Sequence, residues 1–185
     1  MLLKLTKAYS EPHRAYHVLS HPVGMIELGN KIFEGKLTDE QILAIWYHDY
    51  VYVAGSKTNE LESSGKFFEH YGHSTTIALD LVQRIILDTK EHIPTVHESR
   101  AVIDLDLIGL SDNPRNYRIN AVNVRAEYSA FSDEEWKVGR IKFLKKMIGR
   151  EQIYYTDLIK SFEPQARFNM EYELNLLRIG NPKYK

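Results

Sequence analysis

Apolar residues recur every three or four positions along most of this chain, which is the spacing of one face of an amphipathic helix. The clearest stripe begins at Thr38 and runs through Ile42, Ile45, Trp46 and Asp49, which follow the i, i+3, i+4, i+7 spacing. Few segments show the strict alternation that is typical of β-strands. The pattern therefore predicts an all-α fold of about seven to nine helices.

Capping residues and prolines mark where these helices begin and end. Thr38 with Gln41, and Ser132 with Glu135, form capping boxes that predict two helix starts, and Gly149 predicts the end of the second helix. At 185 residues the chain is most simply one domain, and it shows no internal repeat. The other expected helices cover residues 10–17, 20–35, 59–71, 74–90, 99–110, 114–131 and 163–180.

Composition excludes several classes of protein. The 24 basic and 25 acidic residues leave a net charge of −1, which removes the electrostatic footprint of a general nucleic-acid binder. The chain has no cysteine, hence no disulfide and no thiolate metal site, which fits the cytoplasm. It shows neither the pattern of a signal peptide nor an apolar run of 18 residues. We therefore expect a cytoplasmic protein that does not enter a membrane, and a homo-oligomer stays open.

The candidate chemistry centres on His48 and Asp49. Neighbouring residues on a helix project about 100° apart, so both can reach one metal ion only near the C-terminal half of the helix, with other elements completing the ligand set. The dipeptide alone is a weak signal, because a shuffled chain of this composition contains about 0.4 His-Asp pairs. Asp49 falls on the apolar stripe, however, and a buried carboxylate needs a partner.

Six blocks follow one another along the chain: Arg14-x-Tyr-His17-x-x-x-His21, Trp46-Tyr47-His48-Asp49-x-Val51-Tyr52, Asn59-Glu60-x-x-Ser63, Thr89-x-x-His92, Asp104-x-Asp106-Leu107 and Val124-Arg125-x-Glu127-Tyr128. Together they resemble the HD-domain superfamily, and more narrowly its group of predicted metal-dependent phosphohydrolases. A late segment, Ala166-Arg167-x-Asn169-x-x-x-Glu173-Leu174, also fits, so the resemblance covers nearly the whole chain. Each block is weak alone, and their shared order makes the combination specific.

The resemblance implies a single HD-type helical domain over residues 1–185 and a four-ligand metal site. The implied ligands are His21, His48, Asp49 and Asp106, with His17 as the alternative to His21 and Asp104 as the alternative to Asp106. Such a mixed nitrogen and oxygen set suits a divalent Mn, Fe, Co, Ni or Zn ion, whereas Mg is less natural. One or two ions per chain are compatible with it.

The resemblance also implies roles for residues around the metal. Asp106 or Glu60 would orient or deprotonate a metal-activated water, and His92 would bind a second metal or hold the scissile phosphate. The implied pocket residues are His17, Tyr52, Asn59, Ser63, Arg125 and Arg167. The two arginines are more often internal salt bridges in a helical protein, and His92 equally suits a structural role, so these alternatives stay open.

The expected activity is hydrolysis of a phosphoester in a small phosphorylated compound, with a nucleotide as the favoured substrate class. An HD-type diiron oxygenase is one alternative, although the sequence offers no clue to an oxygenase substrate. A non-catalytic binder of a nucleotide or signalling molecule is the other. Tyr50, Leu105 and Ser111 depart from the group's pattern, which leaves the shape of the pocket, and hence the substrate, undetermined.

Overall fold

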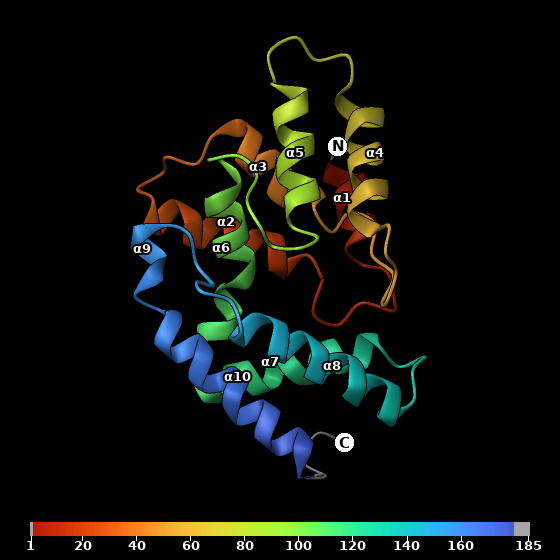
Figure 1. Ribbon diagram of the computed structural model, residues 1–185. Coiled ribbons are helices and arrows are strands. Elements are labelled where there is room, and N and C mark those ends of the chain that lie inside the picture. Colours follow the sequence, from red (N-terminus) through yellow and green to blue (C-terminus); the bar gives the residue numbers. More distant parts are fainter. Residues whose placement is uncertain (1, 180–185) are drawn as a thin grey trace. The chain divides into compact units, whose positions relative to one another are not determined.

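The computed structural model describes residues 2–179. Every regular element in that range is helical, with ten α-helices, one short 3-10 helix and no strand (Figure 1). The prediction of an all-α fold is confirmed. The helices group into two compact units, Met1–Asp106 and Leu107–Lys185, and the single-domain assignment stays a prediction. Among the described residues, no helix combines the length and the apolar character needed to cross a membrane.

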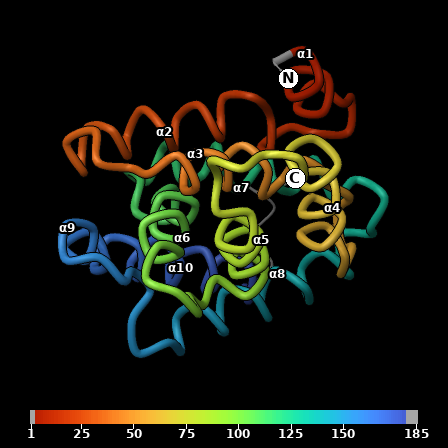
Figure 2. Tube along the Cα trace, turned by 90° about the horizontal axis from the view of Figure 1, so that it is seen from above, coloured from red at the N-terminus to blue at the C-terminus, as the bar shows by residue number. Residues whose placement is uncertain are grey.

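The first unit is built around α5, which packs against both α3 and α4, while α2 runs beside α3 (Figure 2). Ile45, Phe67 and Ile85 come from three of these helices and are completely buried, which stabilises the unit by about 1.5–3 kcal/mol for each side chain. The helices of this unit are α1 (Leu2–Ala8), α2 (Ser20–Ile32), α3 (Asp39–Tyr47), α4 (Asn59–Tyr71), α5 (Leu79–Asp88) and α6 (Ser99–Leu107), the last of which ends at the boundary between the units.

A glycine allows α2 to pack closely against its neighbours in this unit. A Cβ atom placed on Gly29 would lie 2.5 Å from Cδ1 of Leu37 and 2.9 Å from Cδ1 of Leu105, closer than carbon atoms approach. Gly24, one turn and a half earlier on the same helix, has open space where its Cβ would be. Close packing at Gly29 brings α2 against α6, and these two helices each carry one candidate ligand, His21 and Asp106.

The second unit packs α10 against α8 and against the 3-10 helix η1. Glu173 of α10 is 1% exposed and binds Arg140 of α8 through two hydrogen bonds, Nε to Oε1 at 2.8 Å and Nη2 to Oε2 at 2.9 Å. Tyr117 of α7 donates a further hydrogen bond to Oε2 of Glu173. The helices of this unit are η1 (Ile108–Ser111), α7 (Pro114–Glu127), α8 (Asp133–Ile148), α9 (Asp157–Lys160) and α10 (Glu163–Arg178).

The strongest local signals place their helices correctly. Both capping boxes are present, at Thr38 and at Ser132, and Gly149 is the C-cap of α8. The helix expected over residues 10–17 is wrong, because that segment forms turns, whereas α1 was not predicted. The helix expected from Ser74 begins instead at Leu79, since Ser74 Oγ accepts a hydrogen bond from the Thr76 N–H in a local turn. The expected stop of the last helix, residue 180, lies outside the described residues.

Candidate metal centre

The four implied ligands lie in the first unit and come from three segments of the chain. His21 lies in the first turn of α2, Asp106 lies near the end of α6, and His48 is the C-cap of α3. The expectation that Asp49 lies on the helix is corrected, because α3 ends at Tyr47 and Asp49 follows in a turn. His48 itself keeps helical dihedrals and donates its N–H to the carbonyl of Ala44, so the pair stands at the C-terminal end of the helix, where another element can approach both side chains.

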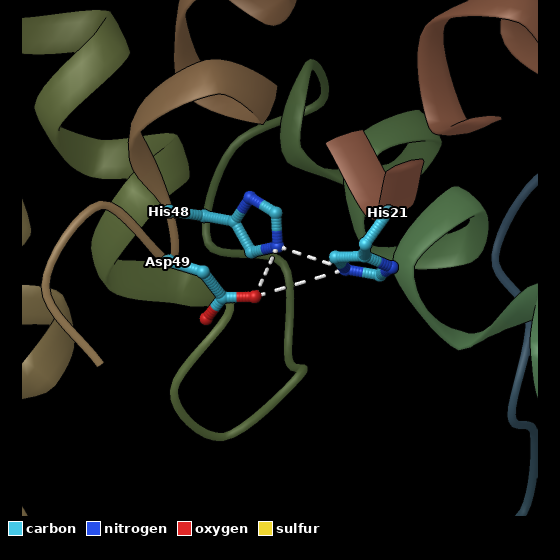
Figure 3. A group of neighbouring side chains, drawn as sticks. All are labelled: His21, His48 and Asp49. Carbon is cyan, nitrogen blue, oxygen red and sulfur yellow. Dashed lines mark hydrogen bonds and ion pairs between the residues drawn. The ribbon is translucent and has the colours of Figure 1, made fainter. Parts of the chain in front are cut away.

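The donor atoms of the four residues converge. Figure 3 shows the imidazoles of His21 and His48 and the carboxylate of Asp49 directed toward one another, and one donor atom from each lies within 4.8 Å of the other two. His48 Nε2 lies 2.9 Å from Asp49 Oδ2 and 3.3 Å from His21 Nε2. Asp106 Oδ1 closes the group, 3.1 Å from His21 Nε2 and 3.6 Å from His48 Nε2. His21 is also 3.7 Å from Asp49 Oδ2.

These separations match those between the ligands of a bound ion. Ligand atoms about 2.1 Å from a transition-metal ion are separated from one another by about 3.0 Å at 90° and about 3.4 Å at 109°. The five separations in the cluster run from 2.9 to 3.7 Å. Two imidazoles and two carboxylates also provide the charge of −2 that a divalent cation neutralises. The cluster of His21, His48 and Asp49 can therefore hold a metal ion, and Asp106 is placed to add a fourth donor atom.

One hydrogen bond sets which nitrogen of His48 faces the cluster. The Nδ1–H of His48 donates to the carbonyl oxygen of Ile45 at 2.8 Å, because a carbonyl can only accept. In the neutral ring the lone pair is therefore on Nε2, the atom that faces Asp49 and Asp106. A backbone carbonyl behind a histidine is the usual means of fixing the tautomer of a metal-binding imidazole.

Electrostatics favour positive charge at this point. Burial would lower the pKa of His48, but Asp49 and Asp106 outweigh it and raise this pKa well above its usual value. Burial would raise the pKa of both carboxyl groups. However, His48 and His17 lower the pKa of Asp49, and hydrogen bonds from His21 and His48 hold the pKa of Asp106 well below its usual range. Without a cation the site thus retains ionised carboxylates and draws a proton onto the imidazole between them.

Two further histidines flank the cluster, one beside each carboxylate. His17 Nε2 lies 3.9 Å from Asp49 Oδ2, and His92 Nε2 lies 3.2 Å from Asp106 Oδ2. Distance favours His21 over His17 as the ligand, because His21 Nε2 lies 3.1 Å from Asp106 Oδ1 and 3.3 Å from His48 Nε2, whereas His17 Nε2 lies 3.9 Å from Asp49 Oδ2. The side chains of His17 and His92 are 19% and 23% exposed, against 2% for His48. They therefore form the more accessible edge of the centre.

His92 is held there by an unusual backbone. Its φ of 50° lies in the left-handed region, which costs a residue other than glycine about 1 kcal/mol or more. The connection that carries it is fixed by Asp88, which accepts hydrogen bonds from Thr95 N at 2.7 Å and from Ser99 Oγ at 2.6 Å. Strain that the surrounding structure maintains in this way is a feature of functional sites.

Two residues expected to line the pocket hold the chain that follows Asp49. Asn59 is buried, accepts a hydrogen bond from Val53 N and donates one to Val53 O, and Ser63 does the same for the N–H and carbonyl of Val51. Each thus acts on the backbone between Asp49 and α4. Contact between these two side chains and a substrate stays a prediction.

Tyr52 and Glu60 are two other candidates in the first unit, and Tyr52 contacts a residue beside the cluster. The ring of the buried Tyr52 stacks on His17, with the ring centroids 4.1 Å apart. Glu60 lies half-buried in the first turn of α4, and its catalytic role stays a prediction.

The two expected phosphate-binding arginines have partners within the second unit. Arg125 donates to the carbonyls of Tyr128 and Phe131 beyond the end of α7 and pairs with Asp133 at 2.9 Å. Arg167 donates to Glu163 Oε1 at 2.9 Å and to the carbonyls of Ile148 and Arg150. Internal ion pairing, the alternative left open for both, is therefore what the structure contains. Phosphate binding by either residue stays a prediction.

The sequence offers no role for Arg14, which the structure places at the centre of the contacts around Asp49. Its partners there lie 35 and 36 residues further along the chain, so no local signal reports them. Comparison with known proteins adds no assignment: no family model matches this chain, and no match is found among curated proteins or solved structures.

Proposed function

We propose that this protein is an HD-type, metal-dependent phosphohydrolase that acts on a small phosphorylated compound, with a nucleotide as the substrate class. The observation that carries the proposal is the convergence of His21, His48, Asp49 and Asp106, which come from three segments and present two nitrogen and two oxygen donors at ligand-like separations. A divalent ion bound by such a set lowers the pKa of a coordinated water and polarises a phosphoryl oxygen.

The side chains around the cluster are suited to two further roles, activating the water and contacting the phosphate. Asp106 can act through both oxygens, because Oδ1 faces the two ligand histidines while Oδ2 lies 3.2 Å from His92 Nε2. The Asp106–His92 pair is thus suited to orient the attacking water and to accept its proton, with Glu60 as the other candidate for that role. His92 and His17, at the accessible edge, are the groups suited to contact the phosphate of the substrate.

The proposal is tested by measuring metal content and phosphate release in four variants. His48→Ala and Asp49→Ala each remove a donor, so we expect both to lose the bound metal and the release of phosphate from nucleoside monophosphates. His17→Gln leaves the four donors intact and is expected to keep the metal while slowing turnover. His73→Gln changes an exposed histidine of the same unit and serves as the matched control.

Each outcome has a definite reading. Full metal stoichiometry in both His48→Ala and Asp49→Ala would overturn the metal assignment. A wild-type protein that binds metal and is stabilised by nucleotides, yet releases no phosphate from any of them, would be a binder and not a hydrolase. Loss of metal together with loss of turnover, while His73→Gln remains normal, would support the proposal.

A further inference from the structure

Arg14 is the most completely engaged side chain near the candidate metal centre. Its side chain has no exposed surface, and the guanidinium carbon lies 5.2 Å from the ring centroid of Tyr9 and 5.5 Å from that of Tyr52. A guanidinium has five N–H donors in one plane. In Arg14 the Nε–H and one Nη2–H are directed at Glu11 Oε2, at 3.1 and 3.0 Å.

The other three donors join two segments of the chain. Nη1 donates to the carbonyl of His17 at 3.1 Å and to that of Asp49 at 2.8 Å, and Nη2 donates to the carbonyl of Tyr50 at 3.0 Å. One guanidinium therefore fixes the backbone of Asp49 against the backbone of the segment that leads into His21. Hydrogen bonds from a charged donor contribute about 1.5–3 kcal/mol each, more than those from a neutral group.

Arg14 begins a continuous row of such contacts. The five carbonyls from Asp49 to Val53 each accept a hydrogen bond from a side chain, in chain order from Arg14, Arg14, Ser63, His13 and Asn59. This segment has neither helix nor strand to hold it, so these side chains supply the order that secondary structure supplies elsewhere. Asp49, the first residue of the row, is also a candidate metal ligand.

We propose that Arg14 is a positioning residue of the metal centre, which holds the Asp49 carboxylate in place before any cation binds. The inference rests on the proposed metal site, although not on the reaction carried out there. Lysine cannot replace arginine in this role, because a single ammonium group cannot donate in one plane to three carbonyls and a carboxylate. Removing a group that orients a metal ligand typically lowers the metal affinity by about 10- to 100-fold.

The experiment is a titration of the full-length protein with Co²⁺, followed through its visible absorption, in wild type, Arg14→Lys and Arg14→Gln. We expect both variants to bind Co²⁺ about 10- to 100-fold more weakly than wild type. Arg140→Lys is the control, because it alters a largely buried, ion-paired arginine in the second unit. It is expected to lose folding stability and to keep wild-type Co²⁺ affinity in the folded state.

A double-mutant cycle shows whether Arg14 acts through Asp49. If it does, adding Arg14→Lys to an Asp49→Asn protein causes no further loss of affinity, whereas a general structural effect adds its full cost. Wild-type affinity in both Arg14 variants, or additive losses in the cycle, would overturn the inference while leaving the metal site standing. A wild-type protein that binds no Co²⁺ would overturn the metal site itself.

A second variant keeps the test decisive if the Arg14 variants do not fold. Glu11→Gln removes the charge that anchors the Nε side of the guanidinium, at a half-exposed position that tolerates substitution. We expect a smaller loss of Co²⁺ affinity in the same direction. An unchanged affinity in a folded Glu11→Gln protein would then count against the proposal.

Discussion

Replacing Glu173 measures how far the second unit depends on one buried ion pair. Glu173 is 1% exposed, binds Arg140 through both carboxylate oxygens and accepts a hydrogen bond from Tyr117. Glu173→Gln keeps the shape of the side chain but removes its charge. The guanidinium of Arg140, whose side chain is 10% exposed, then lacks its ionised partner in a site that water hardly reaches.

The expected cost follows from this geometry. Removing one partner of a buried ion pair typically costs about 3–5 kcal/mol, because the remaining charge stays desolvated. The amide retains an acceptor oxygen for Arg140 or Tyr117, so we place Glu173→Gln at the lower end, about 3 kcal/mol. Glu173→Ala also removes the hydrogen bond from Tyr117 and should cost about 1 kcal/mol more. Since a domain is stable by only about 5–15 kcal/mol, either loss is large.

Urea unfolding followed by circular dichroism provides the measurement, with the midpoint and slope compared between variants. Glu171→Gln is the matched control, because Glu171 is an exposed carboxylate on the same helix and its replacement should change stability by less than about 0.5 kcal/mol. If the free energy of unfolding of Glu173→Gln lies within about 1 kcal/mol of wild type, the Arg140–Glu173 pair does not stabilise the unit as argued. The presence of Glu173 in the segment 166–174 would then not be explained by this ion pair.

Two further predictions concern the first unit. Gly29→Ala should lower the free energy of unfolding by about 1–3 kcal/mol, because the added methyl group overpacks against Leu37 and Leu105. Gly24→Ala should raise it by up to about 1 kcal/mol, because its Cβ meets open space. Equal urea midpoints for the two variants would contradict this prediction. Asp88→Ala should cost about 3 kcal/mol of stability and slow phosphate release by freeing the connection that carries His92, while Co²⁺ affinity stays near wild type. A parallel fall in Co²⁺ affinity would show that Asp88 supports the ligands themselves.

Helix boundaries were predictable where the signal is local. Thr38 and Ser132 each begin a helix through a capping box completed three residues later, and such contacts depend little on the rest of the chain. The segment expected as a helix over residues 10–17 forms turns and carries Arg14, which donates to the carbonyls of Asp49 and Tyr50, contacts that no local pattern reports. The missed helix α1 is only seven residues long, so its formation depends on packing and not on propensity.

The candidate site, too, was predictable only in part. The resemblance carried by the ordered blocks implied His21, His48, Asp49 and Asp106 as ligands, and the structure brings the donor atoms of these residues together. The sequence could not reveal that α3 ends at Tyr47, with His48 as its C-cap and Asp49 in the turn that follows. It also could not separate side chains that face the cluster from those that hold the backbone, as Asn59 and Ser63 do.

The row of carbonyls from Asp49 to Val53 affects what would have to be moved to rebuild this centre elsewhere. Grafting His48 and Asp49 onto another helix end would carry over two donor atoms without the scaffold that aims them. The smallest transferable unit also includes Arg14 and His13 from one segment and Asn59 and Ser63 from another, which together bond all five carbonyls. In engineering terms the His-Asp pair is therefore a three-segment module and not a dipeptide motif.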